Sequence, residues 1–175
     1  PKLVALMKHL LLKRMESSLK AFQDSIANLI NVHTVFLNLL NEGVMPIGVV
    51  SQKEMYDTAL NEPDWVDDAL KIQEIAQKIK SSEDTKYDIN AFELTRLKKD
   101  VQFDLQTLTE IRDLVQKLTW KTDDKLQRLQ DLLQKFSGKK VLVFTEFTST
   151  AKYLDTYLKW KGIKKQVDSA TTNSL

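Results

Sequence analysis

The sequence contains no cysteine, and it has only four glycines and three prolines among its 175 residues. The absence of cysteine excludes disulfides, thiol catalysis and thiolate metal sites. So few turn-forming residues argue against a loop-rich all-β fold. No apolar run reaches the length needed to cross a bilayer, and no secretory signal is evident. We therefore expect a cytoplasmic protein without a membrane partner.

The chain also lacks a strong charge of one sign. Its 26 Lys and Arg residues face 24 Asp and Glu residues, which gives a formal net charge of +2. A uniformly basic surface for nucleic acid is therefore not indicated, although local basic patches remain open. A hydrophobic content of 42% and a charged content of 29% are typical of a helical domain.

Apolar residues recur at spacings of three and four through most of the chain, which predicts long helices. We expect helices over residues 61–80, 90–120 and 122–136, and either one long helix or two in tandem over residues 3–41. Residues 43–52 are expected to form a loop of apolar character. The predicted architecture is therefore mainly α, a bundle of long helices.

The C-terminal part of the chain predicts a β-α-β unit. Residues 141–144 form a continuous apolar run, as in a parallel strand covered on both faces. Thr148 or Ser149 is expected to cap the following helix, Gly162 to end it, and residues 163–169 to resume an extended pattern. Such a unit belongs inside a larger doubly wound sheet. We therefore expect the chain to be a piece of a longer protein.

Two stretches carry a resemblance to a known family. LLLKRMESSLKAFQDSI, at residues 10–26, resembles the basic box that follows the first RecA-like lobe of Swi/Snf-type superfamily-two DNA helicases and translocases. KVLVFTEFTSTAKYLDTYL, at residues 140–158, resembles the fourth motif, which opens the second lobe. KTDDKLQRLQDLL directly precedes this motif at residues 121–133. The likeness is closest to the bacterial branch associated with RNA polymerase or defence systems.

The resemblance implies a division into three parts. Residues 1–42 would be the basic interlobe helix region, residues 43–120 a helical insertion, and residues 121–175 the incomplete start of the second RecA-like lobe. In the intact parent, ATP and magnesium would drive two lobes along duplex DNA. The insertion would contact DNA or a protein partner, or would be purely structural.

No catalytic residue and no cofactor site are predicted in the chain itself. The SGKK sequence is not a phosphate-binding loop, because Leu133 occupies the first glycine position and Lys140 replaces the hydroxyl residue. His9 and His33 lie too far apart in sequence to form a helical metal pair. The three tryptophans are isolated in the sequence, so a base-stacking platform is not supported.

The residues that we predict to bind nucleic acid come from the basic helix and from the turn that follows residues 141–144. They are Lys13, Arg14, Thr145, Phe147, Thr148 and Ser149. Hydroxyls and free amides at a helix start can hold phosphate, and the resemblance places this turn near the nucleic-acid track. The alternative is ordinary capping, with Phe147 in the core and Arg14 paired to Glu16 or Asp24.

Two functions therefore remain open from the sequence. The chain is either a fragment of an ATP-dependent DNA helicase or translocase, which supplies part of the DNA track and lobe-coupling helices, or a non-enzymatic helical protein-interaction module. The apolar run at residues 141–144 would leave an open sheet edge in the isolated chain. We expect self-association, or the chain's own helices, to cover it.

Overall fold

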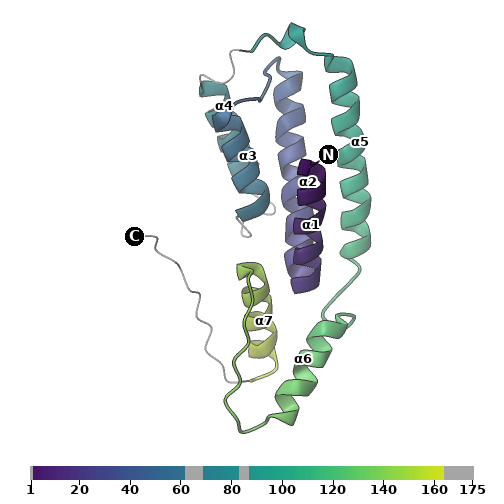
Figure 1. Ribbon diagram of the computed structural model, residues 1–175, viewed down its shortest axis with the longest axis vertical. Coiled ribbons are helices and arrows are strands. Elements are labelled where there is room, and N and C mark those ends of the chain that lie inside the picture. The colour runs from purple at the N-terminus through teal and green to yellow at the C-terminus, as the bar shows by residue number, and fades with distance from the viewer. Residues whose placement is uncertain (1, 62–68, 83–86, 164–175) are drawn as a thin grey trace. The chain divides into compact units, whose positions relative to one another are not determined.

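The computed structural model describes residues 2–61, 69–82 and 87–163, and its fold is mainly α, as the sequence predicts (Figure 1). In chain order the elements are α1 Lys2–Ser17, α2 Leu19–Asn41, α3 Val49–Asn61, α4 Ala69–Ser81, the 3-10 turn η2 Ile89–Ala91, α5 Leu94–Val115, α6 Asp124–Lys135 and α7 Thr148–Trp160. None of the described helices is long and apolar enough to cross a membrane.

The chain divides into two compact units. The terminal unit comprises Pro1–Phe22 and Leu118–Leu175, and the central unit comprises Gln23–Lys117. Helix α2 begins in the terminal unit and continues through the central unit. The resemblance implies three parts with boundaries at residues 42 and 120. That division stays a prediction about the parent protein.

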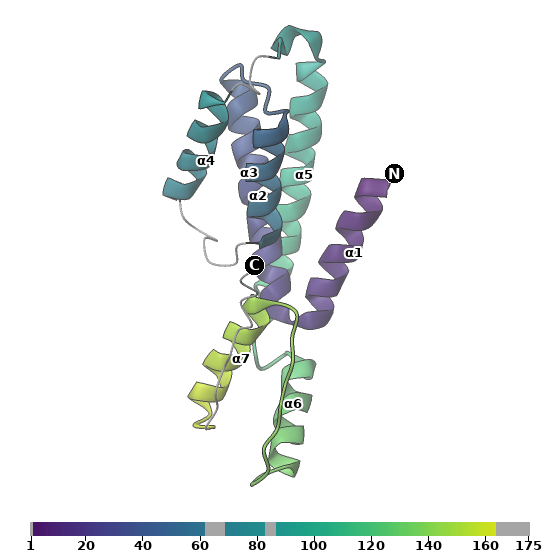
Figure 2. The same ribbon diagram turned by 60° about the vertical axis from the view of Figure 1, so that its left-hand side comes forward.

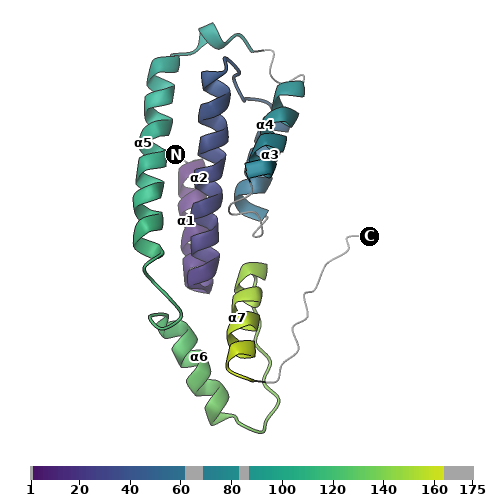
Figure 3. The same ribbon diagram turned by 180° about the vertical axis from the view of Figure 1, so that it is seen from behind.

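In the central unit, α2 and α5 run side by side in opposite directions (Figures 1 and 3). The Gln23 side chain, near the start of α2, donates from Nε2 to the Val115 carbonyl at the end of α5 over 2.9 Å. Further along α2, His33 Nε2 lies 4.0 Å from Asp104 Oδ2 on α5. As the residue number increases along α2, the number of the contacting residue on α5 decreases. The two helices are therefore antiparallel.

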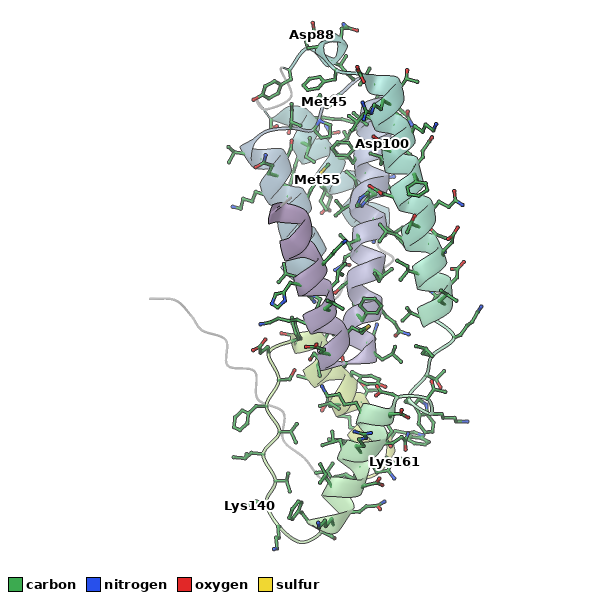
Figure 4. All side chains as sticks on the ribbon, turned by 45° about the vertical axis from the view of Figure 1, so that its right-hand side comes forward. Met45, Met55, Asp88, Asp100, Lys140 and Lys161 are labelled. Atoms are coloured by element: carbon green, nitrogen blue, oxygen red, sulfur yellow. The ribbon has the colours of Figure 1, made fainter. Side chains whose placement is uncertain are left out.

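The core of the central unit joins α2 to α4. Val35 and Leu39 of α2 pack with Ile75 and Ile79 of α4, and all four side chains are buried. Met55 of α3, labelled in Figure 4, packs against this cluster. Each pair is spaced by four residues and so projects from one helix face. Burying a side chain of this size contributes about 1.5–3 kcal/mol, which makes this cluster a main source of the unit's stability.

Helix α3 is the element that the sequence did not predict. We expected a loop over residues 43–52, but the helix begins at Val49, and the Gln52 amide donates to the Gly48 carbonyl over 2.9 Å. Pro46 and Gly48 give the preceding stretch the composition of a loop, which hides the start of the helix. The helix predicted over residues 61–80 is present as α4, and residues 62–68 lie outside the described residues.

The pattern over residues 3–41 forms two helices in tandem. The break lies at Ser18, whose Oγ accepts a hydrogen bond of 3.0 Å from the Ala21 amide. A serine that bonds the amide three residues on is the usual N-cap, and it begins α2 as a new helix. The start predicted for the helix over residues 122–136 is also confirmed. Asp123 caps α6 by accepting a hydrogen bond from the Leu126 amide over 2.9 Å.

The predicted end of α7 is confirmed and its predicted start is wrong. Gly162 has φ +68, a left-handed conformation that suits glycine, and it follows the last turn of the helix. At the other end, the N-cap residue is Phe147, which makes no side-chain cap hydrogen bond. Thr148 and Ser149 lie inside the first turn, so neither is the cap that we expected.

The predicted strand at residues 141–144 is also wrong. The segment runs between α6 and α7 without regular structure, and the part of the chain that the structure describes contains no strand (Figure 2). A strand requires a neighbour for its backbone hydrogen bonds. The second strand of the predicted β-α-β unit, at residues 163–169, lies outside the described residues except for Ile163. The mainly-α class therefore stands, and the β-α-β unit does not appear.

Candidate functional site

Within the terminal unit, the end of α1 meets the start of α7 through four hydroxyl side chains, which we name the hydroxyl cluster: Ser17, Ser18, Thr145 and Thr150. The Thr150 Oγ1 atom lies 2.8 Å from Ser17 Oγ and 2.8 Å from Ser18 Oγ. Ser17 Oγ also lies 3.3 Å from Thr145 Oγ1. The chain thus joins positions that are 133 residues apart in the sequence. The two stretches that carry the family resemblance contact each other here.

Arg14 and Phe147 form a second contact between the same two elements. The Arg14 guanidinium carbon lies 4.9 Å from the centre of the Phe147 ring, within cation–π range. Phe147 is half-buried and is the N-cap residue of α7. Arg14 therefore helps to hold the turn against α1.

Lys13 is the more accessible of the two predicted cations. Its Nζ lies 3.9 Å from Glu146 Oε2, and the two side chains are 47% and 76% exposed. A pair so exposed contributes little to stability, because water and salt screen it. The Lys13 ammonium can therefore exchange Glu146 for another anion at small cost.

Lys125, which was not predicted, supplies a third cation beside the hydroxyl cluster. Lys125 lies in the first turn of α6. Its Nζ donates a hydrogen bond to the Ser17 carbonyl over 3.2 Å and another to the Glu16 carbonyl. These carbonyls lie at the C-terminal end of α1, where a positive charge is favoured by the helix dipole. Lys125 thereby ties α6 to α1.

A cleft of about 490 Å³ opens beside these contacts within the terminal unit. Basic, hydroxyl and aromatic side chains line it, among them Lys13, Lys125, Thr145, Phe147, Thr150 and Tyr153. Acidic groups line it too, including Glu146 and Asp123. The mixed charge suits a contact with a few phosphates, and it does not suit a deep pocket for a free polyanion.

Tyr153, which also lines this cleft, joins α7 to α6. Its hydroxyl donates to Asp123 Oδ2 over 3.0 Å, while Asp123 Oδ1 caps α6. Burial, and then the neighbouring Asp123 carboxylate, raise the pKa of the Tyr153 phenol well above its usual value. Tyr153 therefore stays protonated and acts as a structural hydrogen-bond donor.

The structure also gathers aromatic side chains that are distant in sequence. The Trp120 ring centre lies 4.6 Å from that of Trp160 and 6.0 Å from that of Tyr157, and Lys161 Nζ lies 4.9 Å from the Trp160 ring centre. Trp160 is 62% exposed. The tryptophans are isolated in the sequence, but two of them lie side by side in the fold. Only the fold, and no local sequence signal, brings them together.

The predicted nucleic-acid residues do not all share one environment. Lys13 and Arg14 from α1 lie with Thr145 and Phe147 at the cleft or its border. Thr148 is exposed at the start of α7, whereas Ser149 is only 4% exposed, so its hydroxyl is turned away from solvent. The sequence reasoning missed Ser17, Ser18 and Thr150. The adjacent serines Ser17 and Ser18, which precede α2, were the sequence signal that could have identified this site.

Among the described residues, no group of three or more His, Asp or Glu side chains is placed to hold a metal ion. No protein-family model, no curated protein and no solved structure significantly matches the chain.

Proposed function

We propose that the chain is part of an ATP-dependent DNA helicase or translocase of the Swi/Snf type, and that α1 and the turn before α7 form one surface for duplex DNA. The observation that carries the proposal is the contact of Ser17 and Ser18 with Thr150. It joins the stretch that resembles the family's basic box to the stretch that resembles its fourth motif. A shared surface is what a common DNA-contacting role requires.

The chemistry of this surface supports contact with the phosphate backbone. Lys13 is exposed and loosely paired, and Thr145 and the exposed Thr148 offer hydroxyl donors. The first amides of a helix lack acceptors within the helix and favour anions, and α7 begins at Thr148. Contacts of this kind hold the backbone without reading base sequence.

The chain would supply the DNA track and not the ATP chemistry. It has no phosphate-binding loop, so ATP and magnesium would bind elsewhere in the parent, which would be the ATP hydrolase. Arg14 would act in support, because its stacking on Phe147 holds the turn against α1. Motion of one lobe would then move both DNA-contacting elements together. A cytoplasmic location is part of the same proposal.

The experiment is a titration of a fluorescein-labelled duplex with the full chain, followed by fluorescence anisotropy at several salt concentrations. We expect weak binding without sequence preference and a shallow salt slope, because each phosphate contact adds about 0.9 to the slope. Lys13→Ala should weaken binding several-fold. Lys99→Ala is the matched control, since it removes the same charge from exposed α5 in the central unit.

Two outcomes would overturn the proposal. One is binding that stays unchanged in high salt. The other is an equal loss of affinity in Lys13→Ala and Lys99→Ala, which would assign the interaction to net charge and not to this surface. Circular dichroism of each variant checks that the helices are intact.

A protein-interaction module is the second candidate, and α5 carries the observation that favours it. Phe103 and Leu114 are 69% and 64% exposed. They lie about three turns apart and so share a helix face. An exposed apolar face on the central unit suits a protein partner. The translocase proposal predicts duplex binding that survives the double change Phe103→Gln and Leu114→Gln, whereas an interaction module predicts no duplex binding at any salt concentration.

A further inference from the structure

Residues 139–146 form an exposed, apolar connection in the terminal unit, between the end of α6 and the start of α7 (Figures 2 and 4). Leu142 and Phe144 are 81% and 88% exposed, and Val141 and Val143 are 42% and 48% exposed. Valine, leucine and phenylalanine in succession favour an extended strand. The backbone amides and carbonyls of such an exposed segment form a template for pairing with another strand.

The charges at the two ends of the segment are opposite in sign. Lys139 and Lys140 precede the apolar residues, and Thr145 and Glu146 follow them. Read in one direction, the order is basic, apolar, acidic. An antiparallel copy of the same segment therefore presents its acidic end to the basic end of the first.

We propose that two copies of this chain associate by antiparallel pairing of residues 139–146, about a twofold axis between Leu142 and Val143. In this register Lys139 lies opposite Glu146 of the second copy, and Lys140 lies opposite Thr145 of the second copy. Each charge pair occurs twice, as a twofold interface requires. Opposite charges placed directly across an antiparallel pair stabilise it, and like charges destabilise it.

The same register gives two equivalent apolar faces. Side chains alternate between the faces of a strand, and directly opposed residues share a face. Val141 and Val143 would therefore lie beside Phe144 and Leu142 of the second copy. Pairing also supplies partners for the backbone amides and carbonyls of the segment.

A second copy fits this segment better in antiparallel than in parallel orientation. Parallel, in-register pairing would place Lys139 opposite Lys139 and Glu146 opposite Glu146, which is repulsive at both ends. The existing contact of Glu146 with Lys13 does not compete strongly, because it is 3.9 Å long and both side chains are exposed. The inference concerns self-association and rests on no DNA contact, although the pairing segment shares Thr145 and Glu146 with the cleft described above.

The test is sedimentation equilibrium of the full chain at low salt, over a wide range of protein concentration. We expect a dimer that dissociates on dilution, since a two-stranded ribbon is marginal in stability. Lys139→Glu and Glu146→Lys should each raise the dissociation constant about tenfold, because each places two like-charge pairs across the interface. Lys99→Glu on α5 is the control and should leave it unchanged.

Mixing the two single variants is the decisive step. In a mixed dimer, Glu at position 139 faces Lys at position 146, and the native pair remains at the other end, so association should return. Leu142→Asp should abolish the dimer without changing the helical circular dichroism signal, because Leu142 is exposed in the monomer. The proposal is overturned by a monomer at every concentration, by silent charge variants, or by a mixture that fails to restore association. Amide protection of residues 141–144 in the monomer would also overturn it, since the chain itself would then cover the segment.

Discussion

The Arg14 guanidinium carbon lies 4.9 Å from the centre of the Phe147 ring, and this contact holds the end of α1 to the N-cap of α7. A cation–π contact that is partly exposed contributes about 0.5–1 kcal/mol. We predict a coupling energy of that size in a double-mutant cycle of Arg14→Gln and Phe147→Leu, measured by urea denaturation. A coupling energy near zero would mean that the two side chains are neighbours without mutual stabilisation.

The hydroxyl cluster gives a second prediction. Thr150→Val keeps the shape of the side chain and removes the hydroxyl that serves both Ser17 and Ser18. Thr150 and Ser18 are 4% and 6% exposed, so water replaces the lost partner poorly. The free energy of unfolding of the terminal unit should fall by about 1–3 kcal/mol.

The matched control for this change lies on the same helix. Thr156 is exposed, and its hydroxyl donates to the Lys152 carbonyl one turn earlier. Thr156→Val should alter the free energy of unfolding by no more than about 0.5 kcal/mol. Equal losses in Thr150→Val and Thr156→Val would show that the buried cluster adds nothing beyond helix propensity.

Asp123 has two roles that substitution can separate. Asp123→Ala removes both the cap of α6 and the acceptor for the Tyr153 hydroxyl, and it should lower the free energy of unfolding by about 1–2 kcal/mol or more. Asp123→Asn keeps a good capping residue and an oxygen acceptor, so it should cost much less. Thermal denaturation of the two variants measures the difference, and an equal loss would contradict the capping role.

Tyr153 predicts a dependence of stability on alkaline pH. Its pKa is raised in the folded chain, while the unfolded phenol titrates near pH 10. Above about pH 10 the unfolded state therefore loses a proton that the folded state keeps, and the free energy of unfolding falls as the pH rises. Below that pH the contribution is complete.

Tyr153→Phe isolates this effect from the titration of the lysines. The difference in the free energy of unfolding between the native chain and Tyr153→Phe should be constant from pH 7 to about pH 9.5 and should shrink above pH 10. A difference that grows with rising pH would contradict the raised pKa.

Local signals made some helix boundaries predictable from the sequence, whereas the helix predicted over residues 90–120 spans only Leu94–Val115. Asp123 precedes an apolar stripe and caps the start of α6, and Gly162 follows an apolar stripe and ends α7. Each residue acts on the backbone of one helix end, so its effect can be predicted from the local sequence. The break at Ser18 was left open between one helix and two, because a serine within an apolar stripe is compatible with either. Helix α3 was missed because Pro46 and Gly48, in the segment just before it, are typical of a loop.

The segment at residues 141–144 shows why a pattern can predict the wrong structure. Its apolar run describes a strand in a sheet, but a strand exists only with a partner, and the described residues provide none. The candidate site was predicted in part for a similar reason. Lys13, Arg14 and the turn were identified within their own stretches, whereas Thr150 gains its role only when the fold brings it to Ser17.

The most direct measurement of the central claim is hydrogen–deuterium exchange of the full chain with and without duplex DNA. If α1 and the turn before α7 form one surface, amides in residues 13–18 and 145–151 should gain protection at the same DNA concentration, and Leu94–Val115 of α5 should be unchanged. Lys13→Ala should shift both segments together to higher DNA concentration. Protection of only one of the two segments, or of α5 instead, would contradict the proposal that they contact DNA as a single surface.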